Sequence, residues 1–309
     1  MRVMAHLLIV GAGPVGTGSA LAAVKDGVVD TISGVVDPDP ASRAELEEAT
    51  GAPGYGATVD VPVAREGDRA LVAYSSSAKQ VAPEIVRLVA AGYHVVTTCE
   101  ELAWPPRHIW EAMHTAARSD GRVVLVAGAN PGFVMDQFPL LAAGASRNVS
   151  AITVTSRVDT SQRRASLVAR SGRGLDEAAF ASGIARGDLG HKGLTESARL
   201  LAHGLKWPNQ DVNETVSPIV RNGTVTGVRQ VATLRSDGKT IELRLVLDWN
   251  LPDPGDRVTI SGSPPLDIEI EGGYHGDVGT TAQVVRALAR CTQLGPGFYR
   301  PIDMPLRFG

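Results

Sequence analysis

The stretch Leu7–Ala23, LLIVGAGPVGTGSALAA, decides the fold of the first part of the chain. Four apolar residues, 7 to 10, have the pattern of a short buried strand. Glycines at 11, 13 and 16 follow in the spacing G-x-G-x-x-G, and an apolar helix pattern comes next. In such a turn the first glycine permits the bend, the second lets the backbone approach a pyrophosphate, and the third lets helix and strand pack closely. The helix start offers N–H groups and partial positive charge to phosphates. The stretch predicts a dinucleotide-binding turn; the alternative is a tight turn that binds no nucleotide.

Strand and helix patterns continue to alternate up to about residue 132. We expect strands at 7–10, 32–36, 70–74, 94–98 and 123–127, and helices at 15–25, 41–49, 81–91 and 105–117. Gly92 and Gly121 stand where helices should end, and Pro105 fits the first turn of its helix. Strands that are apolar on both faces are typical of a parallel sheet. The pattern therefore predicts a Rossmann-type doubly wound sheet over residues 1–132, with ligands bound beyond the carboxyl ends of its strands.

The pattern changes after residue 132. We expect helices at 133–143, 175–186 and 195–205 and a strand at 151–158, followed by long alternating strands. Asn222-Gly223 and Asp237-Gly238 are hairpin signals. Residues 133–275 are thus predicted to form an α+β substrate and dimerisation domain with a mainly antiparallel sheet. A helix at 277–289 should return to the first domain with the rest of 276–309, and 296–308 should be irregular.

Composition excludes several classes of protein. Apolar residues make up 43% of the 309 residues and charged residues 20%, and the net charge of −3 gives no basic surface for nucleic acid. The apolar run at 7–10 is too short for a membrane span or a signal peptide. Two cysteines, Cys99 and Cys291, indicate no disulfide framework and fit a reducing cytoplasm. The seven histidines form no metal-binding motif, so no metal is expected.

The residues that follow each strand of the first domain are the candidates for cofactor binding. Asp37 follows the second strand, where an acid can accept hydrogen bonds from the adenosine ribose. Its charge should repel a 2′-phosphate and favour NAD over NADP, although Arg43 is close enough in sequence to soften this preference. Ser75–Ser77 and Asn130 follow later strands; their alternative roles are a plain polar loop and a turn that merely ends a strand. The expected cofactor-binding residues are Gly11, Gly13, Pro14, Val15, Gly16, Asp37, Ser75, Ser76, Ser77, Thr98 and Asn130.

Five stretches carry a resemblance that covers nearly the whole chain. They are VVTTCEELAWP (95–105), GANPGFVMDQFP (128–139), GHKGLTESARLLAHGLKW (190–207), GGYHGDVGTTAQVV (272–285) and PGFYRPIDMP (296–305). With them the chain resembles 2,4-diaminopentanoate dehydrogenase and the native amine dehydrogenases, within the dihydrodipicolinate-reductase-like group. The resemblance implies NAD(P)H-dependent reductive amination of a small ketone with ammonia, or the reverse oxidative deamination of an amine or diamino acid. Imine or carbonyl reduction without ammonia is one alternative, and a non-catalytic nucleotide-binding protein is another.

Departures from neighbouring families point to the acidic pair Glu100–Glu101. The chain lacks the paired histidines and the K-x-G-T motif of dihydrodipicolinate reductase proper, and it has Cys99-Glu100-Glu101 where homoserine dehydrogenases place a lysine. A carboxylate there can accept a proton from an ammonium ion or an amino-alcohol intermediate and can stabilise a cationic iminium. The alternative is that both acids are exposed in the first turn of a helix. We expect one of them to be catalytic and favour Glu101.

The second domain should supply the substrate pocket and an interface. Arg157 could bind a substrate carboxylate through paired hydrogen bonds, although a solvated rim is the favoured interpretation of its charged cluster. His191 and His275 lie in family-like stretches, where a structural role is the alternative. The expected pocket residues are Phe133, Phe138, Arg157, His191 and His275. The alternating strand at 241–249 has one apolar face that helices need not cover fully, which predicts a homodimer built through this domain.

Overall fold

The computed structural model describes residues 4–208 and 211–304, and the chain divides into two units. One unit comprises Met1–Gly132 and Gly276–Gly309, and the other comprises Phe133–His275. Each unit has its own sheet and its own apolar core.

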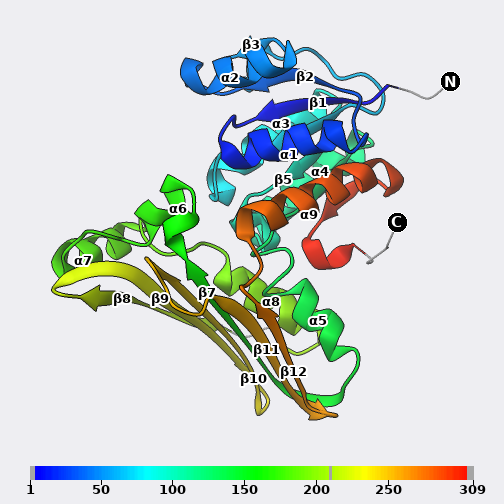
Figure 1. The fold of residues 1–309 in the computed structure, drawn as a ribbon. Coiled ribbons are helices and arrows are strands. Elements are labelled where there is room, and N and C mark those ends of the chain that lie inside the picture. The colour runs from blue at the N-terminus through cyan, green and yellow to red at the C-terminus, as the bar shows by residue number, and fades with distance from the viewer. Residues whose placement is uncertain (1–3, 209–210, 305–309) are drawn as a thin grey trace. The chain divides into compact units, whose positions relative to one another are not determined.

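The first unit contains a parallel sheet of seven strands in the order β13-β6-β5-β4-β1-β2-β3. Helices α1 and α9 pack together on one face, and α3 and α4 pack together on the other (Figure 1). This arrangement confirms the predicted Rossmann-type sheet. The strands are β1 (His6–Val10), β2 (Thr31–Val36), β3 (Gly54–Tyr55), β4 (Arg69–Val72), β5 (His94–Thr97), β6 (Val123–Val126) and β13 (Gly297–Tyr299), and the helices are α1 (Pro14–Lys25), α2 (Pro40–Thr50), α3 (Ala78–Ala90), α4 (Arg107–Ser119) and α9 (Gly276–Arg290).

The central strand β1 is apolar on both sides because helices cover both faces of the sheet. Leu7 and Ile9 pack in one core cluster with Ala20 of α1 and Leu288 of α9. All residues from Leu7 to Val10 are buried. The return of α9 therefore completes the core around the first strand, at the opposite end of the sequence.

Three local expectations for helices and strands were wrong. Pro105 precedes α4, which begins at Arg107. The helix expected from residue 133 begins at Gln137, because the Asp136 carboxylate accepts the Gln137 N–H and caps α5 there. Gly297–Tyr299 in the supposedly irregular last segment is a strand; three residues are too few for a pattern, and their pairing partner β6 is distant in sequence. Residues 305–308 of that segment lie outside the described part of the chain.

The second unit contains a sheet of six strands in the order β12-β11-β7-β10-β9-β8. β7 and β10 are parallel, and the other neighbouring strands are antiparallel. The prediction of a mainly antiparallel sheet is therefore confirmed. Both hairpin signals form turns in which Asn222-Gly223 and Asp237-Gly238 have positive φ. The strands are β7 (Arg147–Asp159), β8 (Val212–Arg221), β9 (Thr224–Ser236), β10 (Lys239–Asp248), β11 (Gly255–Ser263) and β12 (Leu266–Glu271), and the helices are α5 (Gln137–Ala143), α6 (Ala165–Arg170), α7 (Glu177–Arg186) and α8 (Leu194–Gly204).

Helices cover the centre of the apolar face of this second sheet. Leu243 and Leu247 of β10 are buried in one cluster with Ala198 and Leu201 of α8. The expectation that helices leave this face partly uncovered holds at its edges, since Val212 and Val216 of β8 and Leu266 and Ile268 of β12 are only half-buried. The polar face of the sheet is the one without helices in this unit.

Among residues 4–208 and 211–304, no helix has both the length and the apolar content that a membrane crossing requires. The same residues contain no group of three or more His, Cys, Asp or Glu side chains suited to a metal ion.

Candidate functional site

The glycine turn between β1 and α1 has the shape of a dinucleotide cradle. Gly11 has φ +103°, and a Cβ atom there would lie 2.8 Å from Cβ of Tyr74. A Cβ atom at Gly16 would lie 2.1 Å from the Gly11 carbonyl oxygen. A Cβ atom at Gly13, in contrast, would meet nothing within 4 Å among the described residues. Packing therefore requires Gly11 and Gly16, whereas Gly13 leaves open space at the turn, as the approach of a pyrophosphate requires.

The residues around this turn fit the adenosine half of such a cofactor. Helix α1 begins after Gly13 with no side chain capping it, so its first N–H groups are suited to phosphates. One carboxylate oxygen of Asp37 accepts the Ala12 N–H at 2.9 Å, and the other accepts the Asp39 N–H at 3.0 Å. The Arg43 guanidinium donates to the Asp37 carbonyl oxygen. The turn and the ribose-binding candidate Asp37 are thus held side by side.

The loop after β4 contacts one of the two candidate catalytic acids. The backbone N–H of Glu101 donates to the Ser76 carbonyl oxygen at 3.3 Å. Oε2 of Glu101 accepts the Ala78 N–H, the first of helix α3, at 3.0 Å. Ser77, the residue before α3, makes no capping bond with its own side chain, so the Glu101 carboxylate caps this helix. The predicted Ser75–Ser77 loop and the predicted acid are therefore directly connected.

The neighbours of Glu101 lie in the same 3₁₀ turn, Glu100–Ala103, at the carboxyl end of β5. Glu100 and Glu101 are both half-buried. Cys99 is fully buried, and its burial raises the pKa of its thiol far above the usual value. Cys99 is therefore a protonated packing residue rather than a nucleophile.

Two further predicted residues follow neighbouring strands of the same sheet. Thr98 comes after β5, and its N–H donates to the Val72 carbonyl oxygen of β4 at 3.1 Å. Asn130 follows β6, and the adjacent Ala129 N–H donates to Oγ1 of Thr280 in α9 at 3.2 Å. The returning helix α9 thus holds the turn that carries Asn130.

The second unit brings two predicted pocket residues together with a third aromatic side chain. The rings of Phe133 and Phe138 are 5.9 Å apart between centroids, and the rings of Phe133 and Tyr274 are 5.2 Å apart. All three side chains are half-buried. They form an aromatic cluster, Phe133–Phe138–Tyr274, that remains partly accessible.

The predicted histidines differ in how they are held. Oε1 of the buried Gln230 accepts the His191 N–H, and its Nε2 donates to the His191 carbonyl oxygen, both at 2.8 Å. The backbone of His191 is therefore fixed on both sides. His275 is exposed and directly follows Tyr274.

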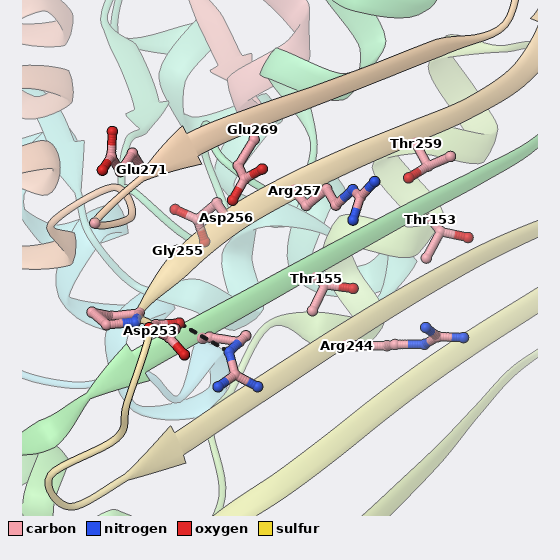
Figure 2. Close-up of a pocket in the computed structure, with 13 residues that line it drawn as sticks. Thr153, Thr155, Arg244, Asp253, Gly255, Asp256, Arg257, Thr259, Glu269 and Glu271 are labelled. Atoms are coloured by element: carbon pink, nitrogen blue, oxygen red, sulfur yellow. Dashed lines mark hydrogen bonds between the residues drawn. The ribbon is translucent and has the colours of Figure 1, made fainter.

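Arg157 lies on the other face of the second sheet from the helix-covered core. Its Nε donates to the Asp253 carbonyl oxygen at 3.1 Å, and its Nη2 donates to that of Pro252 at 2.8 Å. Figure 2 shows this surface, an open depression of about 910 Å³ on strands β7 and β10 to β12. The structure therefore separates Arg157 from the aromatic cluster, because alternate residues of a strand point to opposite faces.

Sequence reasoning missed Tyr274 and its buried neighbour Asp256. Tyr274 lies in the quoted stretch GGYHGDVG, next to the predicted His275. Asp256 points to the same face of β11 as the buried residues Val258 and Ile260. An acid at an apolar position of an alternating strand was the signal that could have identified it.

Comparisons with known proteins identify the family of the chain and match its fold. A family model described as the 2,4-diaminopentanoate dehydrogenase C-terminal domain matches residues 133–308. The 2,4-diaminopentanoate dehydrogenase of Acetoanaerobium sticklandii is 26% identical over an alignment of 277 residues that covers 81% of this chain and 77% of that protein. The solved amine dehydrogenase of Mycobacterium smegmatis has a TM-score of 0.86 at 16% identity and covers 98% of this chain and 97% of its own. The WlbA dehydrogenase of Bordetella pertussis, solved with NADH and UDP-GlcNAcA, has a TM-score of 0.61 at 16% identity over 95% of this chain and 88% of its own.

Proposed function

Because the chain belongs to the 2,4-diaminopentanoate dehydrogenase family, defined by its C-terminal domain, we propose that it catalyses the reductive amination of a small ketone with ammonia and the reverse deamination. The chain is an NAD(P)-dependent oxidoreductase that acts on CH–NH₂ groups. The ketone, the use of ammonia and the favoured direction are the proposed part.

The observation that carries this proposal is the Glu101 carboxylate at the carboxyl end of β5. Ligands of doubly wound sheets bind at this edge, and the Ala78 N–H fixes one oxygen of the carboxylate there. In the described part of the chain the other oxygen, Oε1, makes no hydrogen bond. An oriented carboxylate of this kind suits work on an amine, since it can accept a proton and offset a developing positive charge.

Each step on the substrate can be assigned a proton or a charge. Glu101 accepts a proton from the ammonium ion, and the ammonia so formed adds to the ketone carbonyl. One proton on the nitrogen moves to the former carbonyl oxygen, which gives the neutral amino alcohol. Glu101 then gives its proton to the hydroxyl, which leaves as water, and the ionised carboxylate stabilises the iminium. The nicotinamide cofactor, when bound, supplies the hydride in amination and accepts it in deamination.

The cofactor-binding part of the proposal rests on the glycine turn and Asp37. The Asp37 carboxylate, held by Ala12 N–H, disfavours a 2′-phosphate, so we propose NAD as the preferred cofactor. Arg43 donates to the Asp37 carbonyl oxygen and can lessen the preference. A wild-type kcat/KM clearly higher with NADPH than with NADH would contradict this preference.

The substrate part of the proposal rests on the second unit. The partly accessible rings of Phe133 and Phe138 suit the apolar substituents of a ketone, with His191 and His275 as the proposed polar residues. Arg157 is left out, because its guanidinium is bonded to the carbonyl oxygens of Pro252 and Asp253 on the other face of the sheet.

The test is a panel of ketones with NADH or NADPH, with and without ammonium chloride, followed at the absorbance band of the reduced nicotinamide. The proposal expects oxidation of the cofactor only when a ketone and ammonium are both present. Equal turnover without ammonium would indicate a carbonyl reductase. Cofactor binding without turnover of any ketone would indicate a non-catalytic nucleotide-binding protein.

A further inference from the structure

Asp256 is a carboxylate buried in the second unit with no part in the chemistry proposed above. It is 3% exposed, and its neighbours of the same strand phase are Val258 and Ile260, both in the apolar core. Burial raises the pKa of this carboxyl above its usual value. A buried acid is costly unless hydrogen bonds compensate for its lost hydration, so its partners indicate what it does.

The partners of Asp256 come from a neighbouring strand and from the end of the unit. Ser156 of β7 lies directly opposite in the strand register, and its hydroxyl donates to the carboxylate. The second donor is the backbone N–H of Tyr274, which bonds to Oδ2. The positive charge of Arg163 also acts on the carboxylate. The Tyr274 bond joins two positions 18 residues apart in sequence.

This bond holds the segment that follows β12 against the start of β11. Gly272 and Gly273 have φ of 72° and 78°, and the Gly273 N–H closes the turn on the Ile270 carbonyl oxygen at 3.0 Å. A Cβ atom at Gly273 would lie 3.5 Å from Oδ2 of Asp256, so the turn passes close to the carboxylate. Beyond this turn the Tyr274 ring lies 5.2 Å from that of Phe133. Asp256 therefore fixes the backbone from which the Tyr274 ring projects.

We propose that Asp256 is a positioning residue that holds Tyr274 as the third ring of the aromatic cluster, with Phe133 and Phe138, against which an uncharged alkyl or aryl substituent of the substrate packs. The proposal rests on the proposed function, because it takes the aromatic cluster as the substrate side of the enzyme. It adds a specificity: the cluster contains only aromatic rings, so it favours longer apolar substituents over short ones.

The test measures the affinity of the full-length protein with NADH for acetone and for 2-heptanone, by ligand-observed NMR titration. Each buried methylene contributes about fourfold in affinity, so partial burial of four predicts roughly 10- to 100-fold tighter binding of 2-heptanone. Asp256→Ala should bring the ratio of the two Kd values close to that of Tyr274→Ala. Asp256→Asn should keep most of the wild-type preference for 2-heptanone, because the amide oxygen can still accept the Tyr274 N–H. The double variant should be no worse than Tyr274→Ala alone.

Several results would overturn the proposal. These are equal affinities for the two ketones in the wild type, an unchanged ratio in Tyr274→Ala, or additive losses in the double variant. If Asp256→Ala fails to fold, Asp256→Asn and Tyr274→Ala still decide it. The binding measurement separates this proposal from the proposed function. A ketone preference without ammonium-dependent turnover contradicts the proposed activity alone. Turnover without a ketone preference contradicts the role of the aromatic cluster alone.

Discussion

At the scale of single residues, Glu101 combines a structural bond with the proposed chemistry. Its Oε2 caps α3 through the Ala78 N–H. The two roles can be separated, because a glutamine keeps an acceptor oxygen for the cap and loses the negative charge. Glutamine variants of Glu100 and Glu101 therefore also test which of the two acids acts on the substrate.

We predict that Glu101→Gln lowers the amination kcat by about 10²–10⁴-fold, the usual contribution of a general acid–base group, with an unchanged melting temperature. Glu101→Ala should lose the same activity and, in addition, about 0.5–2 kcal/mol of stability with the cap. Glu100→Gln is the matched control and should be milder. Near-normal turnover in both glutamine variants would reject a carboxylate mechanism; a large loss only in Glu100→Gln would assign the chemistry to Glu100.

His94 at the start of β5 makes stability depend on pH. Burial, and then the charges of Arg122 and Arg69, lower the pKa of His94 from 6.5 to about 4. Its Nδ1 accepts the Val123 N–H at 3.2 Å, which requires the neutral ring. Between these two pKa values the unfolded chain binds a proton that the folded chain does not. Stability is therefore complete above pH 6.5 and falls as the pH drops toward 4.

We predict that this loss is at most about 1.4 kcal/mol per pH unit, reduced by solvent screening of the half-buried ring. His94→Asn keeps an acceptor for the Val123 N–H and does not titrate, so its stability should fall less over the same pH range. Urea unfolding of both proteins at pH 7 and pH 5 measures the difference. Equal losses in the two proteins would show that His94 does not cause the effect.

At the scale of elements, the glycine turn separates packing from cofactor binding. A Cβ atom at Gly16 would lie 2.1 Å from a backbone oxygen, whereas one at Gly13 would meet nothing within 4 Å. Gly13 also has φ −70°, which alanine adopts without strain.

We predict that Gly16→Ala destabilises the first unit and lowers the melting temperature, because strand and helix must separate to admit a methyl group. Gly13→Ala should keep the wild-type melting temperature and raise the KM for NADH, because its methyl group occupies the space left for the pyrophosphate. Thermal unfolding and cofactor titration of the two variants provide the comparison. An unchanged KM in Gly13→Ala would argue against a nucleotide in this turn.

The sequence predicted correctly those elements whose pattern lies within a few consecutive residues. Leu7 to Val10 and the glycines after them form one continuous pattern, and the two hairpin turns contain the residues their positive φ requires. β13 was missed because three residues become a strand only through their pairing with β6. The face on which Arg157 lies could also have been predicted. In β7, Ile152, Val154 and Ser156 point to the buried face, so the alternation of the strand places Arg157 on the opposite face.

Candidate site residues could be named from the sequence only where they follow a strand. Asp37 and Glu101 could be named because parallel strands carry ligands at their carboxyl ends. The bond from Ala78 to Glu101 and the bond from Tyr274 to Asp256 join elements distant in sequence. No local pattern records such pairs, so they emerge only from the folded chain.

At the scale of the whole molecule, the polar face of the second sheet offers a surface for a second copy of the chain. On this face Thr155 of β7 lies between Arg244 of β10 and Arg257 of β11 in the strand register. Arg257 forms an ion pair with Asp267, and Arg244 forms one with Glu242. A face that carries both charges in a fixed pattern can complement itself across a two-fold axis. We propose a homodimer through this polar face instead of the apolar one expected from the sequence.

This proposal predicts twice the chain mass of 32.4 kDa in light scattering at micromolar concentration. Thr155→Arg would place three arginines side by side across β10, β7 and β11, and the same row would face it in the partner. The variant should be monomeric, because like charges in an interface cost several kcal/mol, while its half-buried position preserves the fold. Thr155→Val, which keeps the shape without adding charge, should remain dimeric. A monomeric wild type, or a Thr155→Arg variant that stays dimeric, would exclude this face as the interface.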